Sequence, residues 1–303
     1  MPEDHISQKR AVYRIAGMER ALVRKDVAYR TTDAGPLTLD LYSPADAADG
    51  TRRPAVVLVA GYNDVGYEKM LGCRFKEMAM TVSWAQLIAA SGMIAIAYTN
   101  REPAADLDAL LEHLRQHATA LGIDESRLGV WACSGNVPLA LSALMRDRTT
   151  TPGPRGPGLQ DEARLGLRCG ALLYGYMLDL DGATGVAEAA QTFRFTNPNA
   201  GRTLDDLPAD LALFIVRAGL EQFPHLNDSI DRFVAGALAL NRPITVVNHA
   251  TGPHSFDLLQ DSEASRAIIR QSLEFLRAQL TPRGLRSADA PSRRRERPAR
   301  GIH

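Results

Sequence analysis

The stretch that decides the fold runs from Arg127 to Met145 and reads RLGVWACSGNVPLALSALM. Its first six residues, 127–132, are mostly apolar and include Val and Trp, which is typical of a strand buried on both faces. From Val137 onward, leucines and a methionine recur at helical spacing. Only the residues Ala-Cys-Ser-Gly-Asn, 132–136, remain to join the two elements. We therefore predict a strand that turns directly into a helix.

This abrupt junction singles out Ser134 as a candidate nucleophile. The residue at such a turn takes a strained backbone conformation, and its side chain stands above the carboxyl end of the sheet. The sequence departs from the usual G-x-S-x-G pattern because Ala132 and Asn136 occupy the glycine positions. Taking Cys133 as the nucleophile instead would put the large Trp131 where a small side chain is needed. The spacing therefore favours Ser134.

The composition is that of an ordinary globular protein. Of the 303 residues, 45% are apolar and 23% are charged, and 35 basic residues balance 35 acidic ones. This balance indicates neither a nucleic acid nor a membrane as a partner. The N-terminal residues lack the layout of a signal peptide, and no apolar run approaches the roughly 20 residues that cross a bilayer. The odd set of Cys73, Cys133 and Cys169 lacks metal-ligand spacing, so we expect buried free thiols and a cytoplasmic location.

Strand and helix patterns alternate along the chain. We expect an antiparallel hairpin within residues 27–42, followed by strands at 54–60, 93–98, 127–132, 167–174, 211–217 and 244–248. Helical spacing of apolar residues predicts helices at 82–90, 103–121, 137–145, 226–240 and 264–280. This alternation predicts an α/β fold with a mostly parallel central sheet and helices on both faces.

The prediction treats residues 1–280 as one domain. Within residues 1–25, apolar residues among charges predict an amphipathic helix packed outside the sheet. The irregular segment 175–207 is long enough to form a lid or a pocket wall. Residues 281–303 hold seven Arg and two acids with little apolar material, which predicts a disordered tail.

Functional groups gather beyond the carboxyl ends of the strands in open parallel sheets. Ser134, Glu221 and His254 each follow an expected strand, in that chain order. A serine hydroxyl is nearly unreactive at neutral pH and needs a neighbouring base. Histidine suits that role because its unperturbed pKa is ~6.5, and a carboxylate fixes its tautomer. The backbone N–H groups of Gly135 and of Tyr62, which follows the strand at 54–60, would stabilise an oxyanion.

The other histidines are weaker candidates for a functional role. His249 precedes His254 by five residues and lies at a strand end, where we expect it to pack or to form a hydrogen bond. We favour His254 as the base because Thr-Gly-Pro, 251–253, supplies a loop that can reach the nucleophile. His225 is expected to line a surface or the pocket. His113 and His117 lie one helical turn apart without a third ligand, so they predict no metal site.

From Val27 to Leu280 the chain resembles the α/β-hydrolase superfamily, chiefly its dienelactone-hydrolase-like and esterase branches. The resemblance rests on the strand–serine–helix junction and on the order nucleophile, acid, histidine. It implies Ser134 as the nucleophile, Glu221 as the acid and His254 as the base. The chain departs from the family where Ala and Asn replace the motif glycines. It also has Ala-Gly-Tyr where many relatives have His-Gly, and Glu where Asp is commoner.

The identity of the acid stays open. Glu221 comes soon after its strand, whereas Asp228 falls inside the following helix. Asp179 follows the preceding strand, where some relatives place their acid.

The resemblance implies a serine hydrolase that acts on a small-molecule carboxylic ester through an acyl-enzyme, without a metal or organic cofactor. Three alternatives remain at this point. The first is a peptidase or amidase on the same fold, the second a dienelactone-hydrolase-type activity, and the third a non-catalytic protein that kept the binding pocket. The sequence does not decide between a monomer and a homo-oligomer.

Overall fold

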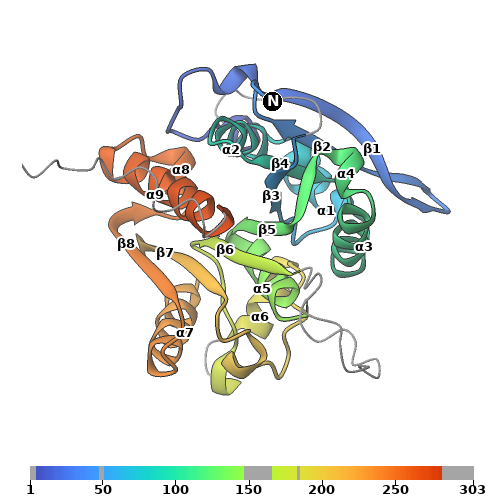
Figure 1. Cartoon of the computed structure of the whole chain (residues 1–303). Helices are drawn as coiled ribbons and strands as arrows, with labels where there is room; N and C mark the ends of the chain where they lie inside the picture. Colours follow the sequence, from blue (N-terminus) through green and yellow to red (C-terminus); the bar gives the residue numbers. More distant parts are fainter. Residues whose placement is uncertain (1–4, 48–50, 147–165, 183–184, 282–303) are drawn as a thin grey trace, which may run out of the picture.

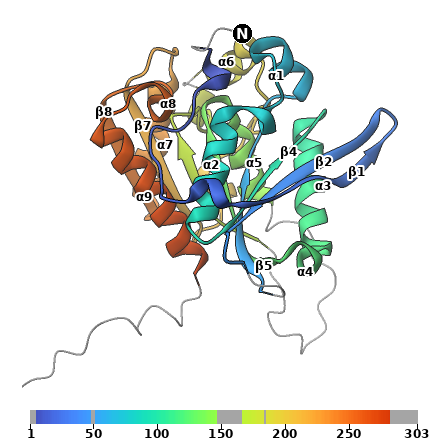
Figure 2. The same cartoon turned by 90° about the horizontal axis from the view of Figure 1, so that it is seen from above.

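The computed structural model describes residues 5–47, 51–146, 166–182 and 185–281 (Figures 1 and 2). Eight strands of this part of the chain form one sheet in the order β1-β2-β4-β3-β5-β6-β7-β8. Their bounds are β1 Leu22–Thr32, β2 Gly35–Ser43, β3 Arg53–Leu58, β4 Ile94–Tyr98, β5 Ile123–Cys133, β6 Leu167–Leu173, β7 Ala212–Leu220 and β8 Ile244–Pro253. Neighbours from β4 to β8 are parallel, whereas β2 pairs antiparallel with both β1 and β4. The predicted α/β class, with its N-terminal hairpin, is confirmed.

Helices cover both faces of this sheet, as Figure 1 shows. One face carries α2 (Ala79–Ala90) and α9 (Glu263–Leu280), and the other carries α3 (Pro103–Gln116), α5 (Val137–Arg146) and α7 (Leu226–Ala239). The chain moves from β3 to β4 in one direction and from β4 through β5 to β8 in the other. Because such crossovers are right-handed, this reversal puts α2 on the face opposite α3, α5 and α7.

The core surrounds β5, the strand that leads to Ser134. Residues Leu128 to Cys133 are buried, as expected for an uninterrupted apolar run between two parallel neighbours. Trp84 of α2 packs on Trp131 of β5 with ring centroids 4.7 Å apart, and both rings are fully buried. Truncating a buried Trp to Ala typically costs about 3–5 kcal/mol. This contact therefore fixes α2 firmly against the central strand.

The predicted helix within residues 1–25 is wrong. The described part of this segment contains only the short 3-10 turns η1 (Ile6–Gln8) and η2 (Met18–Arg20), and β1 follows directly. The N–H of Ala11 donates to Ser83 Oγ at 2.9 Å, and the N–H of Val12 donates to the Asp257 carbonyl at 2.8 Å. Distant parts of the chain accept these backbone N–H groups. The segment therefore runs across the molecule and does not need the internal hydrogen bonds of a helix.

Two segments without a clear sequence pattern carry short helices. After β3, α1 (Asp64–Leu71) starts at Asn63, whose side chain accepts the N–H of Gly66 at 2.7 Å. Segment 175–207 contains the turn η5 (Leu180–Gly182), the helix α6 (Val186–Phe193) and the turn η6 (Leu204–Asp206). The remaining short helices are α4 (Ala118–Leu121) and α8 (Phe256–Leu259).

Apart from Thr281, the predicted tail lies outside the described residues. None of the described helices has the length and apolar character needed to span a membrane.

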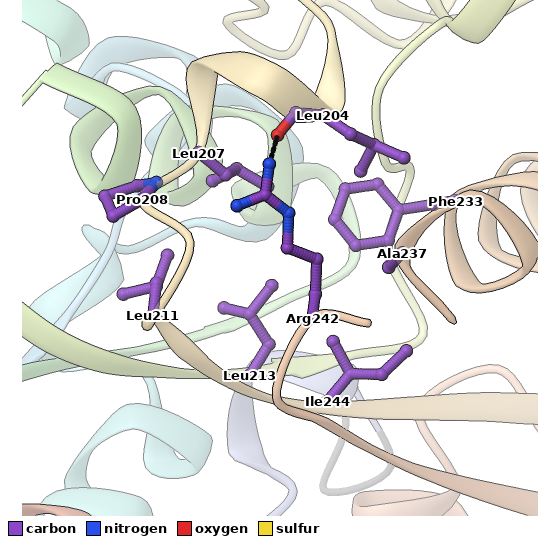
Figure 3. Close-up of a pocket in the computed structure, with 9 residues that line it drawn as sticks. All are labelled: Leu204, Leu207, Pro208, Leu211, Leu213, Phe233, Ala237, Arg242 and Ile244. Carbon is purple, nitrogen blue, oxygen red and sulfur yellow. Dashed lines mark hydrogen bonds between the residues drawn. The ribbon is translucent and has the colours of Figure 1, made fainter. Parts of the chain in front are cut away.

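A small hollow lies where β7 and β8 begin (Figure 3). Its lining is apolar apart from Arg242, whose guanidinium donates to the Leu204 carbonyl at 3.2 Å. The cavity volume is about 10 Å³, which holds at most one water molecule. We therefore regard this hollow as a packing feature under η6 and not as a ligand site.

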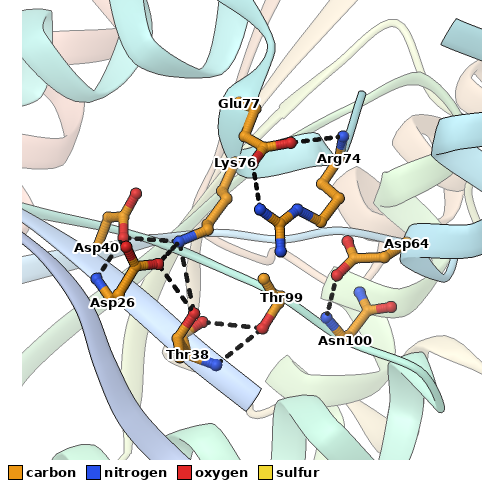
Figure 4. Close-up of polar contacts among 9 residues, drawn as sticks. All are labelled: Asp26, Thr38, Asp40, Asp64, Arg74, Lys76, Glu77, Thr99 and Asn100. Atoms are coloured by element: carbon orange, nitrogen blue, oxygen red, sulfur yellow. Dashed lines mark hydrogen bonds and ion pairs between the residues drawn. The ribbon is translucent and has the colours of Figure 1, made fainter. Parts of the chain in front are cut away.

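A cluster of three charged residues, of which Lys76 and Asp40 are buried and Asp26 is exposed, ties the N-terminal hairpin to the rest of the molecule (Figure 4). Lys76 Nζ, from the turn η3 (Phe75–Glu77), donates to Asp26 Oδ1 at 2.6 Å and to Asp40 Oδ1 at 2.8 Å. The N–H of Asp26 donates to Asp40 Oδ1 at 2.9 Å. Burial opposes the charge of Lys76, but the two carboxylates outweigh burial and raise its pKa above the ordinary value. We call Lys76, Asp26 and Asp40 the Lys76 cluster.

Candidate active site

Ser134 occupies the strand-to-helix junction that the sequence predicts. The 3-10 turn η4 (Ser134–Asn136) joins β5 to α5 directly, and Ser134 has a φ of 54°. This left-handed backbone is uncommon for a residue with a side chain. The junction is crowded from behind, because a Cβ at Gly175 would lie 2.3 Å from Val137 Cγ2 and 2.5 Å from the Ser134 carbonyl oxygen. Only glycine fits at position 175, and its backbone packs closely against the strained turn that carries Ser134.

Three side chains from three strand ends form one line of hydrogen bonds. Ser134 Oγ lies 2.9 Å from His254 Nε2, and His254 Nδ1 lies 2.6 Å from Glu221 Oε2. Glu221 Oε1 accepts the backbone N–H groups of Gln222 at 2.8 Å and Phe223 at 3.0 Å. The structure thus brings together the three residues that the sequence analysis selected.

The charges in this line suit a general base. Burial raises the pKa of Glu221, but the hydrogen bond and the charge of His254, with the two backbone N–H donors, lower it overall. Glu221 is therefore ionised at neutral pH, and its side chain is only 1% exposed. An ionised Glu221 takes the Nδ1–H of the imidazole, which leaves His254 Nε2 to accept the proton of Ser134.

The competing acids and histidines lie elsewhere. His249 is buried and shares a hydrogen bond with Ser265 Oγ at 3.0 Å, which is the packing role expected of it. Asp228 faces His225 at 3.2 Å on the surface. Asp179 forms a turn, in which its carbonyl accepts the N–H of Gly182 at 3.2 Å. The imidazole of His254 contacts neither aspartate through Nδ1, since Glu221 holds that nitrogen.

Asn136 has a function that the sequence analysis missed. Its Oδ1 accepts the N–H of Gly61 at 2.7 Å and the hydroxyl of Tyr67 at 2.7 Å, and the residue is buried. The motif glycine is thus replaced by a side chain that ties the end of β3 to the start of α5. The only signal in the sequence is that a polar residue at a buried junction needs partners.

The side chain of Tyr62 lies against Gly135, the other residue predicted to supply an oxyanion donor. The Gly61 N–H is held by Asn136, so Tyr62 is the next backbone donor along the loop after β3. A Cβ at Gly135 would lie 2.4 Å from the Tyr62 hydroxyl oxygen, so the Tyr62 side chain covers the residue that follows the nucleophile. This placement keeps Tyr62 and Gly135 as the candidate oxyanion hole.

Aromatic rings from segment 175–207 form a wall beside the site. Phe195 stacks on Tyr176 with centroids 5.4 Å apart and meets the edge of Tyr62 at 6.5 Å. The backbone N–H of Thr196 donates to the Gly61 carbonyl at 2.8 Å. Asn199 Nδ2 donates to the Pro138 carbonyl at 2.6 Å. Hydrogen bonds therefore hold the wall against the loop after β3 and against the first turn of α5.

Cys133, which the sequence offered as an alternative nucleophile, is not activated. Cys133 is buried, and burial raises the pKa of its thiol well above the ordinary value, so it stays protonated. Cys169 is also buried, whereas Cys73 is half-buried, and all three are free thiols. The rings of His113 and His117 lie 4.4 Å apart. Among the described residues, no three His, Cys, Asp or Glu side chains are placed to hold a metal ion.

The sequence matches no protein-family model and no curated protein. Solved structures do match. Esterase 2 of the planctomycete Thermogutta terrifontis, with propionate bound, is 20% identical with a TM-score of 0.62, and the match covers 88% of this chain and 98% of that chain. The same esterase phosphorylated by paraoxon is 19% identical with a TM-score of 0.60, covering 88% and 97%. Esterase LipW from Mycobacterium marinum is 18% identical with a TM-score of 0.61, covering 86% and 83%. At these identities the likeness concerns architecture, and the chain has the α/β-hydrolase fold of these esterases.

Proposed function

We propose that this protein is a serine hydrolase that cleaves carboxylic esters through an acyl-enzyme on Ser134. The observation that carries the proposal is the line of contacts from Ser134 Oγ to His254 Nε2 at 2.9 Å and from His254 Nδ1 to Glu221 at 2.6 Å. The solved structures named above are esterases, and one of them is phosphorylated by paraoxon. These likenesses support an ester as the substrate class.

In the first half of the reaction, His254 Nε2 accepts the proton of Ser134 while Oγ attacks the ester carbonyl. The new Oγ–C bond converts the carbonyl oxygen into an oxyanion. Backbone N–H groups of Gly135 and Tyr62 stabilise that charge, and each such donor is worth roughly 10²–10³-fold in rate. The ionised Glu221 stabilises the imidazolium that has formed.

The tetrahedral intermediate then collapses, and the C–O bond to the alcohol breaks. The leaving alkoxide takes its proton from His254, which leaves the acyl group on Ser134. His254 Nε2 then removes a proton from a water molecule, whose oxygen attacks the acyl carbonyl. Collapse of this second intermediate releases the carboxylic acid and returns the proton to Ser134.

The aromatic wall favours a short acyl group. Tyr62, Tyr176 and Phe195 pack on one another beside the nucleophile, and Phe195 is buried. The Thermogutta esterase has been solved with propionate and with butyrate bound. We therefore propose that short-chain esters are preferred over long-chain ones.

A fluorophosphonate probe tests the nucleophile. We expect one equivalent of label on the peptide that contains Ser134, and none in Ser134→Ala. Turnover of acetyl, butyryl, octanoyl and palmitoyl nitrophenyl esters, a dienelactone and a dipeptide anilide then defines the substrate. Preference for the lactone would place the protein in the dienelactone-hydrolase-like branch, and preference for the anilide would make it a peptidase. Absence of both label and turnover would leave a non-catalytic binding protein and overturn the proposal.

A further inference from the structure

A fully buried carboxyl group lies behind His254 and has no part in the mechanism above. Asp257, in α8, follows His254 by three residues and is 0% exposed. Its Oδ1 accepts the hydroxyl of Tyr174 at 2.5 Å, and its Oδ2 accepts Trp84 Nε1–H at 2.8 Å. Burial raises the pKa of Asp257, which means that the ionised form is costly in this place. A buried carboxyl group with a raised pKa beside a reactive side chain is a candidate for a functional role.

Tyr174 connects this carboxyl group to the imidazole. Its ring meets His254 edge-on, with centroids 5.0 Å apart and an interplanar angle of 68°. Tyr174 directly follows β6, and its φ of 36° is unusual for an aromatic residue. Its N–H donates to the Val216 carbonyl at 2.7 Å, which holds this backbone against β7. Strain of this kind persists where the surrounding structure fixes it, and it is concentrated at functional sites.

His254 lies between two rings, and only one of them is anchored. Phe223 packs on the imidazole with centroids 4.7 Å apart, but Phe223 is 38% exposed and contacts the half-buried Phe193. Tyr174 is 1% exposed, and its hydroxyl is fixed by Asp257. Of the two rings that pack on the imidazole, Tyr174 is therefore the one whose side chain is fixed by a hydrogen bond.

We propose that Asp257 is a positioning residue for His254: it fixes the Tyr174 ring through one hydrogen bond, and this ring holds the imidazole in line with Ser134. Trp84 anchors the second oxygen of the carboxyl group, so the line of contacts runs from α2 to the reacting nitrogen. The proposal rests on the proposed function, because that function assigns the proton transfer to His254.

Tyr174→Phe tests the proposal with the least disturbance, since it keeps the ring and removes only the hydroxyl. We expect kcat on a nitrophenyl ester to fall about tenfold with little change in KM, because misplacement of the base matters in the transition state. Tyr29→Phe is the matched control. Tyr29 is also a buried tyrosine, and its hydroxyl donates to the Thr99 carbonyl at 2.6 Å, away from the site. We expect this control to lose a similar amount of stability and to keep kcat.

Two substitutions at Asp257 separate hydrogen bonding from charge. Asp257→Asn keeps an acceptor for Trp84 and offers an N–H to the Tyr174 oxygen, so we expect kcat to stay within about threefold of the wild type. Asp257→Leu has similar volume without either group, and we expect a loss of about tenfold or more. A loss in Asp257→Asn as large as that in Asp257→Leu would assign the effect to the charge and overturn the positioning role.

A proton resonance gives a readout that needs no turnover. The Nδ1–H of His254, held by Glu221, should give a downfield signal in a Ser134→Ala background. We expect the signal to broaden when Tyr174→Phe or Asp257→Leu is added, and to persist with Tyr29→Phe or Asp257→Asn. If the wild type hydrolyses no ester, the proposed function fails while this comparison still tests the positioning. An unchanged signal and an unchanged kcat in Tyr174→Phe would overturn it.

Discussion

Two of the ionic groups in the described part of the chain differ in design, and the comparison shows how the partners of a charge decide whether it serves stability or catalysis. In the Lys76 cluster, one ammonium group meets two carboxylates, and a further contact reaches Thr38 Oγ1 at 3.4 Å. In the active site, the carboxylate of Glu221 meets one nitrogen of His254, and the second nitrogen faces Ser134. The first arrangement holds a fixed charge in place, whereas the second ends in a nitrogen that can gain and lose a proton.

Burial alone does not distinguish the two groups. The side chains of Lys76 and Asp40 are 3% and 6% exposed, and those of Glu221 and His254 are 1% and 18% exposed. The two groups differ in the elements of the fold that they connect. The Lys76 cluster joins a 3-10 turn to two strands of the hairpin, so its loss should affect folding. The active-site pair joins two loops at strand ends, so its loss should affect chemistry.

The largest expected effect is the loss of turnover in Ser134→Ala and His254→Ala. Each change removes one partner of the proton transfer, so each should lower kcat/KM by at least about 10⁴-fold. The double variant should cost little more than either single one, because the residues act as a unit. Rates on one activated ester, with circular dichroism to confirm folding, provide the measurement. Residual turnover by Ser134→Ala would remove the basis of the comparison.

Glu221→Gln should have the next largest effect. The amide keeps the size of the side chain but can favour the wrong imidazole tautomer, and an acid-to-amide change of this kind lowers kcat by about 10⁴-fold. Asp228→Asn is the control, because Asp228 pairs with His225 on the surface. The same ester assay should show almost no change for this control. The opposite ranking of the two variants would mean that the acid has been misassigned.

Lys76→Met should affect stability and leave chemistry unchanged. The change leaves Asp40 buried without its ammonium partner, and breaking a buried pair in this way costs about 3–5 kcal/mol. Urea unfolding measures this loss, with Lys69→Met on the exposed face of α1 as the matched control. The rate per active site, counted with the fluorophosphonate probe, should equal that of the wild type. A lower rate per site in folded protein would show that the two groups are coupled.

The sheet and the line of three site residues were predictable because their signals are local. Each parallel strand contains a short apolar run, and Ser134, Glu221 and His254 come shortly after the apolar part of a strand. The N-terminal segment was not predictable in this way. Its apolar residues among charges suggested an amphipathic helix, but the backbone donors of Ala11 and Val12 bond to α2 and α8 instead.

The supporting residues of the site escaped the sequence analysis because their partners are distant along the chain. Asn136 bonds to Gly61 across 75 positions, and Asp257 bonds to Trp84 across 173 positions. Neither residue belongs to a pattern with a period, and each gains its meaning only when the sheet has brought the strand ends together. The sequence analysis treated Asn136 only as a departure from the glycine motif. In the structure its side chain makes hydrogen bonds that a glycine could not make.

Phe195→Ala should change substrate preference by a smaller factor. Removing this ring opens the wall beside Tyr176 and Tyr62, and one or two extra methylene groups in an apolar pocket are worth about tenfold or more in discrimination. The ratio of kcat/KM for octanoyl and butyryl esters should therefore rise. Phe193→Ala, at the more open side near Phe223, should raise it less. If Phe195→Ala lowers only the melting temperature, the ring belongs to the core and not to the pocket.

The smallest expected effect is a difference in how the contributions of the two ionic groups to stability depend on pH. Burial raises the pKa of Glu221, but its hydrogen bond to His254 and the charge there lower it overall below the ordinary 4.5. A lowered pKa means that the contribution of Glu221 to stability is present above about pH 4.5 and is lost as the pH falls through the lower folded-state value.

Lys76 behaves in the opposite sense. Burial lowers its pKa, but Asp26 and Asp40 raise it overall above the ordinary 10.5. Its contribution to stability is therefore complete below about pH 10.5 and is lost as the pH rises through the higher folded-state value. Unfolding free energies from urea titrations across pH provide the measurement. The difference between wild type and Glu221→Gln should shrink toward acid, and that between wild type and Lys76→Met should shrink toward alkali. Two differences that shrink at the same end would show that both groups respond to one charge, and the contrast between a structural and a chemical pair would fail.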